Sequence, residues 1–131
     1  MKTVKLGPPS SRRNMEKILD LPLKAKWYDM IEKGGKGEEY REIKPYWVKR
    51  FFKGLPAKWQ ATMDMAIKSN DFTPFYGIKI HPEYTHIRFR RGYTKRTMLF
   101  ELEYITVNVG FPGWGAPDKD VFVLTLGIRR Q

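Results

Sequence analysis

The sequence has no cysteine, and His81 and His86 are the two histidines among its 131 residues. A chain without cysteine forms no disulfide, holds no zinc through thiolates and has no cysteine nucleophile. Two histidines are too few for a convincing metal cage, so we expect neither a metal nor a cofactor. A metal held by carboxylates alone stays an open alternative.

Long apolar runs and familiar nucleotide-binding motifs are also missing. The chain has no run of about eighteen apolar residues, the length that a membrane helix needs, and its basic N-terminus lacks the apolar stretch of a secretory signal. We therefore expect a cytoplasmic protein without a membrane partner. The absence of a Walker-type loop, a GxGxxG motif and a nucleophile elbow makes nucleotide hydrolysis and hydride transfer poor hypotheses.

The composition indicates one folded domain. Hydrophobic residues make up 41% of the chain and aromatic residues 15%, which is enough for a core at this length. Residues 1–17 are turn-rich and basic without periodicity, and we predict a poorly ordered N-terminal arm there. Residues 18–131 are predicted to form a single domain.

The hydrophobic pattern changes from helical spacing in the first half to alternation in the second. Helices are predicted at residues 25–33, 45–54 and 55–70. Strands are predicted at residues 18–23, 38–43, 76–80, 85–91, 98–109 and 121–129. The proline in the first of them indicates either an edge strand or the end of the strand. Helices followed by strands indicate an α+β domain.

Individual faces of these elements follow from the same periodicity. The stripe predicted to enter the core from the third helix consists of Trp59, Met63, Ala66 and Ile67. Alternation predicts one shared face for Phe100, Leu102 and Tyr104, and an inward face for Phe122, Leu124, Leu126 and Ile128. The Gly- and Pro-rich residues 111–117 are too few for a crossover helix, so they predict a hairpin loop.

The octapeptide at residues 34–41, GGKGEEYR, is the segment that most resembles a site. Its glycines predict the end of the preceding helix and place Lys36 in a turn. Glu39 and Arg41 are two apart on the predicted strand that follows, so they share a face that Lys36 can reach. Such a cluster suits a phosphate, carboxylate or nucleobase ligand. The alternative is a structural cluster that braces the fold.

The spacing GxKxxExR of this octapeptide resembles the signature of the ASCH domain family, relatives of the PUA-type RNA-binding domains. The resemblance extends to a strand and helix before the motif, a helix after it and a pair of C-terminal strands. It implies a small mixed, partly closed PUA-like β-barrel of about five to six strands flanked by about two to three helices. It also implies RNA or nucleotide binding in a cleft lined by the motif, with RNA preferred over DNA.

An enzymatic alternative follows from the same resemblance. Some ASCH proteins are amidohydrolases that remove the acetyl group from N4-acetylcytidine with the motif lysine, a threonine and a distant glutamate. Lys36 matches the lysine, but Glu39 occupies the threonine position and residues 104–131 contain no glutamate. The alternative function is therefore a small hydrolase, either an amidohydrolase or a nuclease-like enzyme, that acts on a modified nucleoside or on RNA. It assigns catalysis to Lys36 and Glu39, and we rank it second to the binding hypothesis.

The formal net charge of +11 is concentrated in segments. Residues 44–58 and residues 84–100 each contain five Lys or Arg side chains and no acid. Clustered cations favour a polyanion, because their binding to phosphates releases counterions. The alternatives are a solvated face that maintains solubility, and an acidic protein partner. DNA is a further alternative to RNA.

Together these observations predict a set of residues that bind RNA or a nucleotide. Trp114 has two open roles, stacking on a base or closing the end of the barrel, and Tyr93 offers a stacking surface in a turn. The predicted binding residues are Lys36, Glu39, Tyr40, Arg41, Lys49, Arg50, Arg88, Arg90, Arg91, Tyr93 and Trp114.

Overall fold

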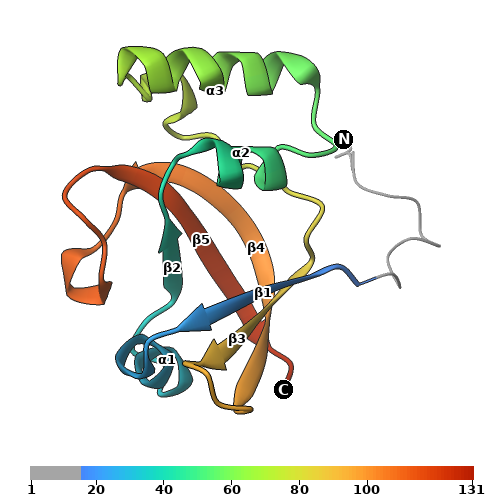
Figure 1. The fold of residues 1–131 in the computed structure, drawn as a ribbon, viewed down its shortest axis with the longest axis vertical. Helices are drawn as coiled ribbons and strands as arrows, with labels where there is room; N and C mark the ends of the chain where they lie inside the picture. The colour runs from blue at the N-terminus through green and yellow to red at the C-terminus, as the bar shows by residue number, and fades with distance from the viewer. Residues whose placement is uncertain (1–15) are drawn as a thin grey trace.

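A curled, five-stranded sheet forms a half-barrel with three α-helices around it in the computed structural model, which describes residues 16–131 (Figure 1). The strand order is β1-β3-β4-β5-β2. The strands are β1 (Ile18–Leu23), β2 (Glu38–Arg41), β3 (His86–Arg91), β4 (Thr97–Val109) and β5 (Asp120–Arg129). The prediction of a mixed α+β domain is confirmed, and the half-barrel is compatible with a small barrel.

The pairing of the strands leaves β1 and β2 at the two edges of the sheet. β1 pairs in parallel with β3, whereas the other neighbours are antiparallel. Pro22 lies in β1, so the prediction of an edge strand there is confirmed. The short strand β2 runs between α1 and α2, which lie at its two ends (Figure 1).

The helices are α1 (Ala25–Glu32), α2 (Pro45–Phe51) and α3 (Ala57–Ser69), close to the predicted ranges. α1 ends as expected: Gly34 has a φ of 82°, a left-handed conformation that glycine adopts without strain, and Gly35 N–H donates to the Met30 carbonyl. Pro45 begins α2, where its missing N–H costs nothing. In α3, Met63 and Ala66 are buried, with Trp59 and Ile67 packed beside them.

Residues 76–80 do not form the predicted strand. A short 3-10 helix, η2 (Thr73–Phe75), precedes them, and Ile78 N–H donates back to the Phe75 carbonyl. A single bridge between Ile80 and Ile105 joins this segment to the sheet. Phe75 is fully buried. Its packing in the core favours a turn at the start of residues 76–80, where alternation alone predicted an extended strand.

The faces of β4 and β5 differ from simple alternation. Phe100 and Leu102 both pack in the main core, so their predicted shared face is present, but Tyr104 does not join them, because a register shift between Leu102 and Tyr104 rotates the side chains that follow. In β5, Phe122 and Leu124 enter the main core, and Leu126 packs at its border. Ile128 is 61% exposed, so the prediction of an inward Ile128 is wrong, because β5 continues beyond the part of the sheet that the core covers.

The opposite face of β5 carries a second, smaller core. Val121 and Val123 pack there with Tyr40 of β2 and Ala116, and Trp114 lies against them. Ala116 and Trp114 belong to the loop between β4 and β5, which contains the 3-10 helix η3 (Pro112–Trp114). The prediction of a hairpin with an elaborate loop is therefore confirmed. Both faces of β5 are buried near its start because this loop folds back over the sheet.

The predicted N-terminal arm lies mostly outside the described residues, since residues 1–15 are not described. Lys17 is described: its backbone N–H donates to Thr85 Oγ1 at 3.0 Å and its Nζ lies 2.8 Å from Glu83 Oε1. The two contacts attach this end of the described chain to the segment before β3. Within residues 16–131, no helix combines the length and apolar character needed to cross a membrane.

Phe122 is fully buried at the junction of sheet and helix, with ring centroids 5.1 Å from Phe51 and 6.2 Å from Phe52. We expect Phe122→Ala to lower the free energy of unfolding by about 3 to 5 kcal/mol, because it leaves a cavity where three rings meet. Urea denaturation measures the change. Tyr93→Ala, at a fully exposed side chain, is the control and should stay within about 0.5 kcal/mol of the wild type. Equal losses in the two variants would contradict this description of the core.

Candidate functional site

The octapeptide places one carboxylate between two cations. Glu39 Oε1 lies 2.9 Å from Lys36 Nζ, and Glu39 Oε2 lies 2.6 Å from Arg41 Nη1. Strand β2 puts Glu39 and Arg41 on the same side of the chain, and the turn after α1 brings Lys36 back to meet them. The predicted convergence of a lysine, a glutamate and an arginine is thus present in the structure, and the trio carries a net charge of +1.

The same two cations also satisfy the backbone of the edge strand. Lys36 Nζ donates to the Glu38 carbonyl at 2.5 Å, and Arg41 Nη1 donates to the Tyr40 carbonyl at 2.7 Å. The Gly37 carbonyl accepts from Leu126 N–H, so alternation points the carbonyls of Glu38 and Tyr40 away from β5. The motif therefore closes the free edge of β2, which would otherwise expose unpaired acceptors.

Lys36 is almost entirely enclosed, with 2% of its surface exposed. Its Nζ lies 4.7 Å from the ring centroid of Tyr40 and 5.8 Å from that of Trp27. Burial lowers the pKa of Lys36, and the attraction of Glu39 opposes that shift. A buried ammonium needs such a partner, because an unpaired charge in an apolar site is strongly unfavourable.

Tyr40 connects the motif to the loop between β4 and β5. Its hydroxyl donates to Glu38 Oε1 at 2.8 Å and accepts from Phe111 N–H at 3.1 Å. A Cβ atom on Gly110 would lie 2.5 Å from the Tyr40 ring, so the loop backbone packs directly on that ring. Burial, chiefly, raises the pKa of Tyr40 to about 12. Tyr40 therefore remains a neutral hydrogen-bonding group at physiological pH.

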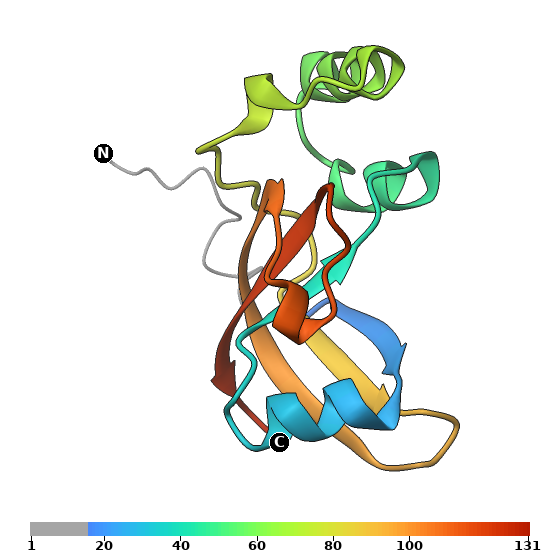
Figure 2. The same cartoon turned by 90° about the vertical axis from the view of Figure 1, so that its left-hand side faces the viewer.

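A cleft of about 260 Å³ opens beside the motif, between the end of β1, the start of α1, β2 and the loop between β4 and β5. Figure 2 faces this side of the molecule and shows the loop with η3 in front of the sheet, between α1 and α2. The cleft is lined by Pro22, Leu23, Lys24, Trp27, Glu39, Tyr40, Arg41, Trp114 and Gly115. It lies between the two edge strands, where the half-barrel is open.

The aromatic side chains in this lining are Trp27, Tyr40 and Trp114. Trp27 of α1 reaches Gly115, where an added Cβ would lie 2.9 Å from the indole. Gly115 has a φ of 97°, so both its conformation and its lack of a side chain bring the loop against Trp27. Trp114 packs edge-on against Phe111 at a centroid distance of 5.2 Å, which orients the loop aromatics.

Charged groups complete the lining. Lys24 is exposed, and within residues 16–131 it forms no ion pair. Arg41 retains an exposed fraction of 19%, and its hydrogen bonds to other described residues all use Nη1. Within residues 16–131, Nε and Nη2 of Arg41 have no hydrogen-bond partner. The cleft can therefore offer two cations, one shared carboxylate and flat apolar surfaces to the same small molecule.

The predicted site residues are divided among three places. Glu39, Tyr40, Arg41 and Trp114 line the cleft, whereas Lys36 lies behind Glu39 and does not line it. Lys49 and Arg50 are on α2, and Arg88, Arg90 and Arg91 are on β3. Tyr93 is in the exposed turn that follows β3.

The cations on and after β3 are largely neutralised by acids. Arg91 Nε and Nη2 donate to the two carboxylate oxygens of Asp29 at 2.9 and 3.1 Å. Arg96 Nη2 lies 2.5 Å from Glu32 Oε1, and Arg88 Nη1 lies 3.4 Å from Asp20 Oδ1. These pairs attach the β3–β4 hairpin to α1 and β1, and they account structurally for much of the second basic segment.

Sequence reasoning missed two prominent cleft residues, Lys24 and Trp27. Trp27 falls within the helix predicted at residues 25–33. One signal for its role is that it follows Lys24 by three positions, which puts both on one side of the first turn. Within residues 16–131, no three His, Asp or Glu side chains are grouped so that they could hold a metal ion.

Comparison with known proteins adds no relative: no model of a protein family, no curated protein and no solved structure matches the chain. The resemblance of GxKxxExR to the ASCH signature accordingly stays a prediction. Any function assigned to the chain therefore depends on the geometry of its cleft.

The buried trio makes a prediction about stability. We expect Glu39→Gln to lower the free energy of unfolding by about 3 kcal/mol, because it removes the carboxylate that pairs with a buried ammonium. Lys36→Met should cost less, since it removes the buried charge together with its need for a partner. Urea denaturation at neutral pH compares the two. A larger loss in Lys36→Met than in Glu39→Gln would contradict the assigned role of Glu39.

The same trio predicts a pH dependence. Burial keeps the pKa of folded Lys36 below its ordinary value, so between the folded and unfolded pKa values the unfolded chain binds more protons. In that window the contribution of Lys36 to the free energy of unfolding rises with pH. The wild type should therefore gain stability relative to Lys36→Met as the pH rises toward about 10. Urea denaturation of both proteins from neutral to alkaline pH tests this, and a relative loss would contradict it.

Proposed function

We propose that this protein is a binding module that recognises a nucleotide, or a single base of an RNA strand, in the cleft beside the GxKxxExR motif. One observation carries the proposal: Trp27, Tyr40 and Trp114 line the same 260 Å³ cleft as the cations Lys24 and Arg41. The base of a nucleotide is flat and stacks on aromatic rings, and the phosphate of the nucleotide binds guanidinium and ammonium groups. The volume of the cleft suits a single nucleotide better than a duplex.

The carboxylate of Glu39 gives the cleft a further means of selection. It accepts from Lys36 and Arg41, and each carboxylate oxygen has capacity for more than one hydrogen bond. An amino group on the edge of a base is a suitable donor to it. Because Lys36 holds Glu39 in place from behind, we regard Lys36 as a positioning residue and Glu39, Arg41 and Lys24 as contact residues.

The fold supports the ASCH-type, PUA-like part of this proposal at the level of architecture. The half-barrel, the motif at the start of an edge strand and the cleft beside it agree with what the resemblance implies. RNA is preferred over DNA because the PUA relatives bind RNA. An acidic protein partner is the rival binding hypothesis, and it leaves the aromatic lining of the cleft without a role.

Equilibrium binding to RNA at several salt concentrations tests the proposal. We expect the wild type to bind a mixed-sequence, single-stranded RNA of about eight nucleotides, and affinity to fall as salt rises because counterions are released. Arg41→Gln should weaken binding about tenfold, since a charge-assisted contact is lost. The control is Lys95→Gln, which removes the same charge at an exposed hairpin position and should change affinity by less than about twofold. Absent binding at low salt, or equal effects of the two variants, would contradict the proposal.

A hydrolase is the second candidate, and one observation favours it: burial lowers the pKa of Lys36, as in lysines that act as general bases. The position of Lys36 behind Glu39 and the enclosure of its Nζ oppose direct contact with a substrate. Incubation with N4-acetylcytidine decides between the two functions. We expect no release of acetate. Release that disappears in Lys36→Met but survives in Arg88→Ala would establish the hydrolase and displace the binding module.

A further inference from the structure

A row of two aromatic rings between two cations leads from the cleft onto α2. Arg41, which lines the cleft, has its guanidinium carbon 5.6 Å from the ring centroid of Trp47. The rings of Trp47 and Tyr46 meet edge-on at 4.8 Å. The guanidinium of Arg50 then lies over Tyr46 at 3.6 Å. We call this row, Arg41–Trp47–Tyr46–Arg50, the α2 ladder.

The outer end of the α2 ladder is exposed. Tyr46 has 51% of its surface open to solvent although Arg50 covers part of its ring. Arg50 is held in place by a 3.3 Å hydrogen bond from Nη1 to the Tyr46 carbonyl, one turn back in the helix. Trp47, by contrast, stacks on the buried Phe51 and anchors the ladder to the core. The ladder therefore presents a preorganised aromatic and cationic surface.

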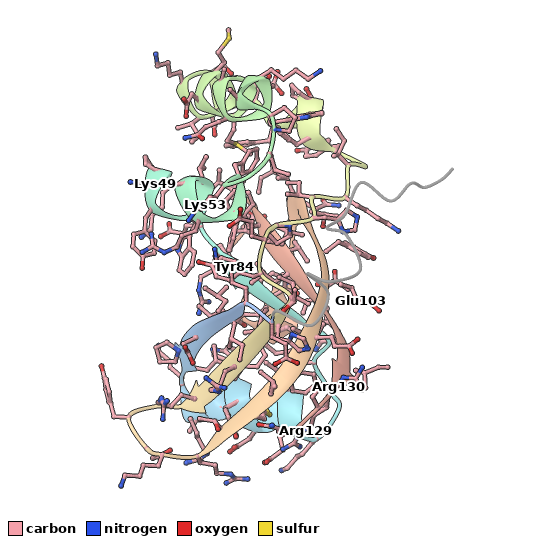
Figure 3. All side chains as sticks on the ribbon, turned by 90° about the vertical axis from the view of Figure 1, so that its right-hand side faces the viewer. Lys49, Lys53, Tyr84, Glu103, Arg129 and Arg130 are labelled. Carbon is pink, nitrogen blue, oxygen red and sulfur yellow. The ribbon has the colours of Figure 1, made fainter. Side chains whose placement is uncertain are left out.

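The outer end of the α2 ladder carries positive charge that no described carboxylate pairs with, although Arg41 at its inner end is paired with Glu39. Among the described residues, neither Lys49 nor Arg50 forms an ion pair. The carboxylate of Glu42, just before the helix, is itself paired with Lys119 at 2.9 Å and with Lys44 at 3.8 Å. Figure 3 shows the Lys49 side chain projecting outward from α2.

The other basic segment differs in both position and pairing. The turn between β3 and β4 lies at the opposite end of the molecule from α2 and α3 in both ribbon views (Figures 1 and 2). Arg91 and Arg96 there are paired with Asp29 and Glu32 of α1. Arg88, Arg91 and Arg96 of the second basic segment are thus paired with carboxylates, whereas Lys49 and Arg50 on α2 have no such partner among the described residues.

We propose that a single-stranded nucleic acid whose base occupies the cleft continues past Arg41 along the α2 ladder, and does not follow the β3–β4 hairpin. In this arrangement one base stacks on the exposed part of Tyr46, while Lys49 and Arg50 bind the adjoining phosphates. Stacking on exposed aromatics requires unpaired bases, so the surface fits a single strand and excludes a duplex. This inference rests on the proposed function of the cleft, and it adds the path of the strand outside it.

The test compares two double variants with matched chemistry, one on each basic segment. Tyr46→Ala with Arg50→Gln alters the α2 ladder, and Tyr93→Ala with Arg90→Gln alters the hairpin. Each pair removes one exposed tyrosine and one arginine without a carboxylate partner among the described residues. The probes are uridine monophosphate and a fluorescein-labelled single-stranded RNA of about eight nucleotides, with thermal unfolding as the check that each variant is folded.

We expect the ladder variant to bind the longer RNA at least about tenfold more weakly, since a stacking contact and a phosphate contact are lost. Its slope of log affinity against log salt should become shallower by about 0.7, the value for one phosphate contact in a single strand. Its affinity for uridine monophosphate should be unchanged. The hairpin variant should lose less than about twofold for either probe.

Other outcomes separate the two proposals. If the wild type binds uridine monophosphate but binds the longer RNA no more tightly, the result supports binding in the cleft and shows that the proposed path along α2 is wrong. An equal or larger loss in the hairpin variant, or equal affinity for a duplex of the same length, also overturns the path. If the wild type binds neither probe at low salt, the proposed function fails and the path fails with it.

Discussion

The carboxylate of Glu39, held between Lys36 and Arg41 on an edge strand, is the interaction on which the rest of the site depends. Lys36 is buried and needs a counter-charge, while Arg41 reaches both this carboxylate and the Tyr40 carbonyl. Without the two cations, β2 would leave two carbonyls unpaired beside an opening in the half-barrel. The motif thus combines a structural task, closing a strand edge, with a position at the border of the cleft.

The two tasks explain why so much of the octapeptide faces inward. Lys36 and Tyr40 use their polar atoms on the motif and on the loop between β4 and β5, so they organise the cleft more than they occupy it. Glu39 and Arg41 face both the buried cluster and the cleft. A ligand that binds Arg41 therefore meets a group whose orientation is already fixed, which reduces the entropy lost on binding.

Much of the local structure could be predicted from the sequence, because it depends on near neighbours. Gly34 ends α1, and the two-residue period of a strand puts Glu39 and Arg41 on one side. The failures involve distant parts of the chain. Strand register shifts rotate β4, and Ile128 lies past the covered part of the sheet. Alternation along one strand contains no information on what covers it.

The same limit applies to the candidate site. The three charged residues of the motif converge as their spacing predicts, but the aromatic lining depends on the loop at Gly115 reaching Trp27, 88 positions earlier in the chain. The pairing of Arg91 with Asp29 is equally long-range, with 62 positions between them. It shows that equal numbers of cations in two segments do not offer equal positive charge to a ligand. Counting charges along the sequence could not distinguish the two basic segments.

The four tryptophans give the most direct measurement of the central claim, that the cleft and the α2 ladder bind single-stranded RNA. Trp27 and Trp114 line the cleft, Trp47 belongs to the ladder, and Trp59 packs against the core. In nuclear magnetic resonance spectra of the nitrogen-15-labelled protein, titration with single-stranded RNA should shift the indole N–H signals of Trp27, Trp114 and Trp47 and leave that of Trp59 in place. Saturating RNA that leaves the signals of Trp27 and Trp114 unchanged would contradict the account.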